Sequence, residues 1–177
     1  MNRRQFLKTG IVGGLTMAIV GAGAVWLNTP SNHAPLTIDA ALILLDDLSK
    51  QTITSSGKWN PSQIFIHCAQ SIELSLSGFP EHKSDFFKHT AGQVAFSAFS
   101  SKGQMTHSLS EPIPGAPRID SQENIKTAMS RFKKSLIAFK QFEGKLEPHF
   151  AYGKLSKLEY ERAHVMHFYN HLQELIV

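Results

Sequence analysis

Apolar residues recur at intervals of three and four residues, between marked helix start and stop signals, over most of this chain. The last such segment is the clearest. Ser156 and Glu159 have the spacing of a capping box, in which each satisfies a backbone N–H at the helix start. The apolar stripe behind it consists of Leu158, Val165, Phe168, Leu172 and Leu175. No segment alternates convincingly between apolar and polar residues, and residues 94–99 are only a weak candidate strand. The sequence therefore predicts an all-α fold.

Earlier segments carry similar signals. Asn60 is a good N-cap, Pro61 suits the first helical position, and Gln63 completes a capping box. Asp120 and Glu123 predict a second start of this kind. The predicted helices cover residues 38–50, 61–77 (stopped by Gly78 and Pro80), 84–99 (with Gly103 behind it), a segment from Asp120 to Gly144, and the segment from Ser156. Four or five helices of this length predict a helical bundle.

Residues 108–119 contain three prolines and one glycine, too many for a helix and too long a run for a tight turn. We expect them to form a surface loop that borders a pocket. Residues 52–58 are also expected to be a loop.

The net charge of +4 does not indicate a nucleic-acid-binding protein. Three of the eighteen basic residues are Arg3, Arg4 and Lys8, and no acidic residue precedes Asp39. From residue 25 onward, the chain has fifteen basic and fourteen acidic residues. A nearly neutral domain without a basic stripe releases few counterions from a phosphate backbone. We therefore expect no nucleic-acid partner.

The N-terminus has the pattern of an export signal. Residues 2–8, Asn-Arg-Arg-Gln-Phe-Leu-Lys, resemble the twin-arginine (Tat) motif, and an uncharged stretch with five glycines follows over 9–27. Ala-Gly-Ala at 22–24 offers a cleavage site. The resemblance implies a Tat signal peptide over 1–24, the Tat translocon as a partner, and a periplasmic or cell-envelope location. Contact with the membrane is expected only if the signal is retained as an anchor to about residue 27. After the signal, we expect a linker over residues 28–36 and a single domain over residues 37–177.

The last helix carries the chemical feature of the sequence. His167 and His171 lie one turn apart, so both imidazoles can address one point, as in helices that bind zinc. Their face lies roughly 90° around the helix from the apolar stripe, which places them at the border of the core. His164 is a weaker candidate, because it stands seven residues from His171. The pair alone leaves open a metal-free, half-buried arrangement. His67, in the second predicted helix, likewise could be an ordinary histidine at the edge of the core.

Four blocks of sequence resemble an uncharacterised family of the DinB/YfiT-like superfamily. They are residues 59–73, 77–80, 149–156 and 164–172, and the resemblance spans roughly 38–177. It implies a four-helix bundle, here with an additional helix or long loop. It also implies a divalent metal ion held by three histidines, which correspond to His67, His167 and His171. The wider group includes thiol-dependent transferases and metal-dependent hydrolases.

Three neutral imidazoles leave a divalent ion its full charge and an open position, as in catalytic sites. Zinc, nickel and other transition metals all suit imidazole. We therefore expect an exported metal-dependent hydrolase or transferase that acts on a small-molecule substrate the sequence does not name. The alternative is a non-catalytic envelope protein whose bundle is a structural or partner-binding module, and a homodimer is left open. Side chains that could orient a ring N–H or accept a proton are Glu73, Glu174, Gln70 and Tyr160. His149 precedes the last helix and is expected to be a surface-loop histidine, with a position facing the pocket as the alternative.

Overall fold

The computed structural model describes residues 35–177. The predicted signal peptide over 1–24 and nearly all of the predicted linker over 28–36 lie outside the described residues. Within the described part, no helix is long and apolar enough to cross a membrane.

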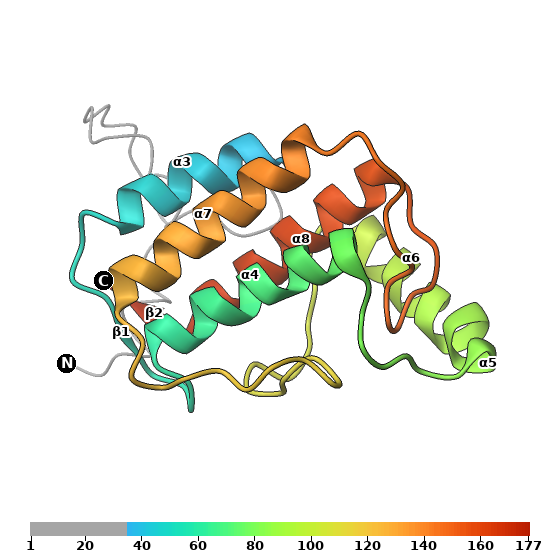
Figure 1. Cartoon of the computed structure of the whole chain (residues 1–177), viewed down its shortest axis with the longest axis horizontal. Helices are drawn as coiled ribbons and strands as arrows, with labels where there is room; N and C mark the ends of the chain where they lie inside the picture. The colour runs from blue at the N-terminus through green and yellow to red at the C-terminus, as the bar shows by residue number, and fades with distance from the viewer. Residues whose placement is uncertain (1–34) are drawn as a thin grey trace, which may run out of the picture.

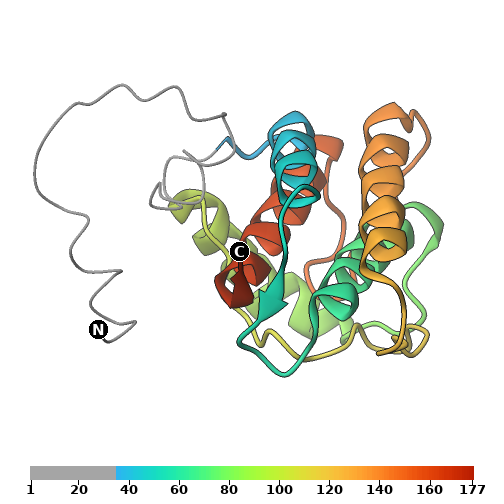
Figure 2. The same ribbon diagram turned by 90° about the vertical axis from the view of Figure 1, so that its left-hand side faces the viewer.

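The described chain is mostly helical, which confirms the predicted all-α class. Four long helices lie side by side and enclose one apolar core (Figures 1 and 2). They are α3 (Ile38–Leu48), α4 (Pro61–Ser77), α7 (Ile125–Gln141) and α8 (Lys157–His171). The shorter elements are β1 (Thr54–Ser55), α5 (Asp85–Phe87), the π-helix η2 (Lys88–Gly92), α6 (Gln93–Lys102), the 3₁₀-helix η3 (Leu172–Glu174) and β2 (Leu175–Ile176).

Two of the three predicted capping boxes, at Asn60 and Ser156, are confirmed. The Asn60 side chain accepts the Gln63 N–H, and the Gln63 side chain accepts the Asn60 N–H. Ser156 and Glu159 exchange the same pair of bonds at the start of α8. These caps fix where α4 and α8 begin, and hence the height of each histidine along its helix.

The predicted helix start at Asp120 and Glu123 is wrong. Helix α7 begins at Ile125, and its N-cap is Asn124, whose side chain accepts the Lys126 N–H at 2.8 Å. The Asp120 carboxylate instead accepts the Gln122 N–H within a turn. Asparagine directly before the first apolar residue of the helix competes successfully with a capping box placed one turn earlier.

The third predicted helix is longer than expected and is interrupted. Helical residues run from α5 through η2 and α6, and end at Gly103, which has the left-handed φ of 66°. A Cβ atom at Gly92, in the π-helical turn, would lie 2.0 Å from the carbonyl oxygen of Ala151. The chain after His149 therefore packs directly against glycine backbone at this turn. The weak candidate strand at 94–99 is part of α6 and is wrong.

The predicted apolar stripe of the last helix is only partly buried. Val165 and Phe168 are in the core, but Leu158 is 66% exposed, and Leu172 and Leu175 lie beyond the end of α8. Leu175 belongs to β2, which pairs with β1 in a two-residue antiparallel ladder that the sequence did not predict. Because α3, α4 and α6 all contact α8, this helix is buried on nearly every side from Tyr160 onward.

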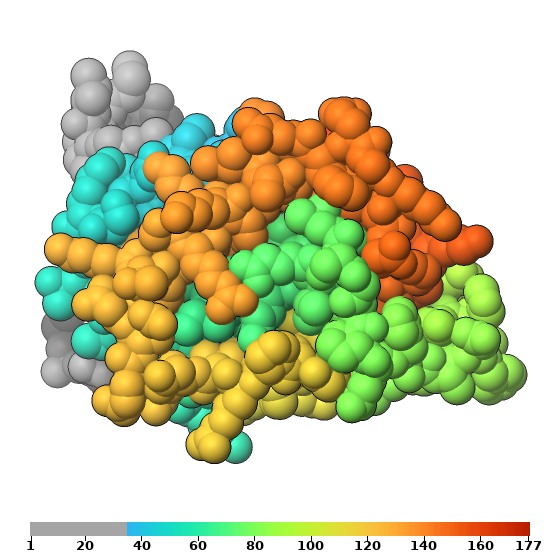
Figure 3. All heavy atoms as spheres, in the orientation of Figure 1, coloured from blue at the N-terminus to red at the C-terminus, as the bar shows by residue number. Residues whose placement is uncertain are grey.

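The segment between Gly103 and Asn124 contains no helix or strand and runs along α4 (Figure 3). The Gln70 side chain donates to the carbonyl of Pro117, and the Asn60 side chain donates to the carbonyl of Ser121. These bonds attach the segment to the helix that carries His67.

Candidate metal centre

Two neighbouring helices bring three histidines together. His67 lies near the middle of α4, and His167 and His171 occupy one face of the last two turns of α8. The exposed fractions of the three side chains are 3%, 9% and 0%. All three rings are buried, and the cleft that was expected to reach the α8 histidines is present, because His167 lines a pocket.

The three imidazoles converge through the same ring atom. His167 Nε2 lies 3.0 Å from His67 Nε2 and 3.2 Å from His171 Nε2. All three potential ligand atoms lie within 4.8 Å of one another. Nitrogen ligands at ~2.0–2.1 Å from a tetrahedral ion stand about 3.3 Å apart, so the spacings of 3.0 and 3.2 Å fit one ion.

The protonation of the rings also suits a cation. Burial lowers the pKa of His67 and of His171 to about 3, and it lowers the pKa of His167 well below the usual 6.5. Neighbouring imidazoles lower these values further in each case. The rings are therefore neutral at pH 7, as a metal ligand must be.

A neutral imidazole carries one N–H and one lone pair. If the protons were on the converging Nε2 atoms, they would point at one another. If the lone pairs are there instead, all three can bind the same cation. His67 Nδ1 and His171 Nδ1 are buried without a hydrogen-bond partner in the described structure. Trp59 packs against both rings, with centroids 4.8 Å from His67 and 6.2 Å from His171, and closes this side of the cluster.

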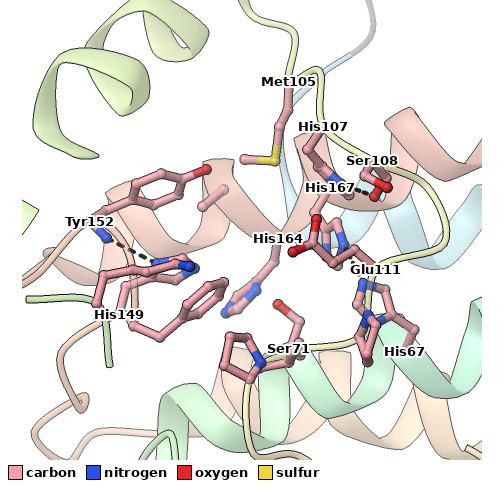
Figure 4. A pocket seen from close by; sticks show the side chains of 16 residues that line it. His67, Ser71, Met105, His107, Ser108, Glu111, His149, Tyr152, His164 and His167 are labelled. Carbon is pink, nitrogen blue, oxygen red and sulfur yellow. Dashed lines mark hydrogen bonds between the residues drawn. The ribbon is translucent and has the colours of Figure 1, made fainter. Parts of the chain in front are cut away.

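A pocket of about 170 Å³ opens beside the three histidines. His67 and His167 line it, whereas His171 does not. Figure 4 shows His149 and Tyr152 on one side of the pocket, and His67, His107 and His167 on the other. Several residues of the 108–119 segment also line the pocket, which confirms the predicted role of that loop.

The family model described as "Protein of unknown function (DUF1569)" matches residues 34–176, which include every one of these side chains. The chain belongs to the DUF1569 family. Neither the curated proteins nor the solved structures give a match to it.

Of the four side chains predicted to assist the metal ligands in this DUF1569 protein, two contact other parts of the chain. Glu73 forms a bidentate ion pair with Arg131 of α7, at 2.6 and 2.9 Å. Gln70 is committed to the carbonyl of Pro117. These contacts hold α7 and the loop in place.

The other two, Tyr160 and Glu174, make no hydrogen bond to the three histidines. The Tyr160 hydroxyl donates to the carbonyl of Glu147 at 2.6 Å, and its ring stacks on His164 at 5.3 Å. The carboxylate of Glu174 lies against Gly57, and burial raises its pKa. The three histidines named from the sequence and the family resemblance thus lie together, whereas the four side chains expected to assist them contact other groups.

The expected surface position of His149 is wrong, and the alternative is confirmed: it is 8% exposed and lines the pocket. Its Nδ1 accepts the backbone N–H groups of Ala151 and Tyr152 at 3.1 and 3.2 Å. The proton of the neutral ring is therefore on Nε2. The ring also stacks on Tyr152 with centroids 4.3 Å apart.

His107 is a pocket residue that the sequence analysis missed. It lies in the irregular segment after Gly103, where no helical spacing relates it to another histidine. Its ring centroid is 4.9 Å from that of His167 and 5.3 Å from that of His171. A solitary histidine in a loop gives no sequence signal for such a contact.

Proposed function

We propose that this DUF1569 protein binds one divalent transition-metal ion through His67, His167 and His171, and that it is a hydrolase or transferase for a small molecule held in the adjacent pocket. The observation that carries the proposal is the convergence of three buried, neutral Nε2 atoms at 3.0–3.2 Å for two of the pairs. Zinc and nickel both suit an all-imidazole site. A bound divalent ion would supply Lewis acidity to an oxygen of the substrate.

The pocket supplies directed polar groups of its own. His149 has its proton on Nε2, and its pKa is lowered to about 3 by burial, so at neutral pH it is a fixed hydrogen-bond donor rather than a cation. His164 Nε2 lies 3.1 Å from Ser75 Oγ, whose own proton goes to the carbonyl of Ile72. The His164 proton is therefore on Nε2, and its Nδ1 keeps a lone pair. One donor and one acceptor are thus preset for a substrate.

The resemblance noted in the sequence supports two wider parts of the proposal. The chain is a DinB/YfiT-like bundle, and the twin-arginine pattern at residues 2–8 directs it through the Tat translocon to the periplasm or envelope. Tat translocation carries folded cargo, so the ion would enter the histidine site before export. The nearly neutral charge of the domain supports a small-molecule partner over a nucleic acid.

The metal content of the purified protein tests the first half of the proposal. About one transition-metal ion per chain is expected for the wild type, and far less for His67→Ala and His167→Ala. His89→Ala is the matched control, because His89 is exposed and distant in sequence from the cluster. Equal metal content in all four proteins would overturn the assignment.

Cobalt(II) in place of the native ion tests the second half. Its visible absorption should change when azide is added, because a small anion can reach the ion through the pocket. An unchanged spectrum would instead support the structural-module alternative, in which the ion has no accessible position.

A further inference from the structure

We propose that His107 is a fourth ligand of the same ion, delivered by the loop between α6 and α7. This inference rests on the proposed metal site and extends it by one residue from outside the bundle.

Ring positions are the first argument. The His107 centroid lies 4.9 Å from that of His167 and 5.3 Å from that of His171. The centroid distances among His67, His167 and His171 themselves are 4.8, 4.9 and 5.1 Å. His107 therefore lies within 0.2 Å of the centroid distances that His67 has to the two histidines of α8.

The tautomer of His107 is the second argument. Its Nδ1 lies 2.7 Å from the carbonyl oxygen of Ser108, so the ring proton is on Nδ1. The Nε2 atom then carries a lone pair, and it is buried without a hydrogen-bond partner among residues 35–177. Histidines that bind metals nearly always donate their second ring N–H to a carboxylate, a backbone carbonyl or water, which fixes the ring and raises its basicity. Within residues 35–177, His107 is the one of the four clustered rings that contacts such a carbonyl.

The attachment of the loop is the third argument. Met105 and Ile113 are buried, at 4% and 5% exposed, and hold the segment at two points. Between them His107, Ser108 and Glu111 line the pocket beside His167 (Figure 4). His107 is not among the three residues whose ligand atoms all lie within 4.8 Å of one another. Binding of the ion by His107 would therefore draw its ring toward the other three, and a molecule in the pocket would compete with His107 for that position on the ion.

Cadmium NMR counts the ligands in the intact wild-type protein. Cadmium-113 bound to protein labelled with nitrogen-15 histidine is split by each nitrogen that is bonded to it. A quintet is expected for four imidazoles, and a quartet would overturn the assignment of His107. A wild-type protein that binds no cadmium would overturn the three-histidine site itself, so the two failures are distinguishable.

The affinity of zinc for His107→Gln gives an independent test. Competition with a chromophoric chelator should show binding about tenfold or more weaker than in the wild type, with the stoichiometry still one ion per chain. His89→Gln is the control and should bind as the wild type does. Equal affinity in His107→Gln and the wild type would contradict the proposal. If His107→Gln does not fold, the cadmium multiplet of the wild type decides alone.

Discussion

Acid should unfold the metal-free protein at a pH where most domains are still stable. Five histidines are buried in the described structure: His67, His149, His164, His167 and His171. Burial lowers the pKa to about 3 for four of them, and well below 6.5 for His167. In the unfolded chain the same side chains have a pKa of about 6.5. Between these values the unfolded chain binds more protons than the folded one, so stability falls as the pH falls below 6.5.

The size of the loss follows from the number of rings. At pH 5.5, one unit below the unfolded pKa, each ring that must stay neutral costs about 1 kcal/mol of folding free energy, from 1.4 kcal/mol per pKa unit. Five rings together cost about 5–7 kcal/mol, as much as the total stability of many domains. The stability is fully present above pH 6.5 and is lost progressively toward pH 3.

Urea unfolding in the presence of a chelator, at pH 5.5, 6.5 and 7.5, measures this dependence. His149→Gln should reduce the slope of unfolding free energy against pH by about one proton, whereas His89→Gln, at an exposed site, should leave it unchanged. A metal-free protein that is equally stable at pH 5.5 and 7.5 would refute the reasoning, because the imidazoles could not then be held neutral by burial.

Three further substitutions test separate contacts by urea unfolding at pH 7.5. Ser75→Ala should cost about 1–3 kcal/mol, because His164 loses the acceptor of its buried Nε2–H; a loss near zero would mean that water replaces the hydroxyl. Phe132→Ala should cost about 3–5 kcal/mol, since the ring is 1% exposed in the core, and a smaller cost would contradict that packing. Glu73→Gln should cost less than about 1 kcal/mol, because its ion pair with Arg131 is exposed, and should leave metal content unchanged. Loss of metal in this variant would mean that Glu73 does assist the metal ligands.

The sequence predicted those parts of the fold that depend on local chemistry. The capping groups at Asn60 and Ser156 satisfy N–H groups within one turn, so the residues that form these bonds are close in sequence as well as in space. The pair of His167 and His171 is local in the same sense. The contribution of His67 came from the family resemblance, because one histidine in an amphipathic helix has no periodicity that identifies it as a ligand.

The unpredicted parts depend on contacts between segments far apart in the chain. The π-helical turn at Gly92 lies directly against the carbonyl of Ala151, a contact that nothing near residue 92 in the sequence reveals. His149 is buried because its loop folds back beside the pocket, where the N–H groups of Ala151 and Tyr152 donate to the His149 imidazole. His107 joins the cluster because buried Met105 and Ile113 anchor an otherwise irregular segment. The exposure of Leu158 likewise reflects which neighbours surround α8, and not its own spacing.

Anomalous diffraction from a crystal of the zinc-loaded protein tests the central claim most directly. The account predicts one strong peak within ~2.0–2.1 Å of the Nε2 atoms of His67, His167 and His171. A zinc-loaded crystal with no peak among these three atoms, or with its only peak elsewhere on the molecule, would contradict it.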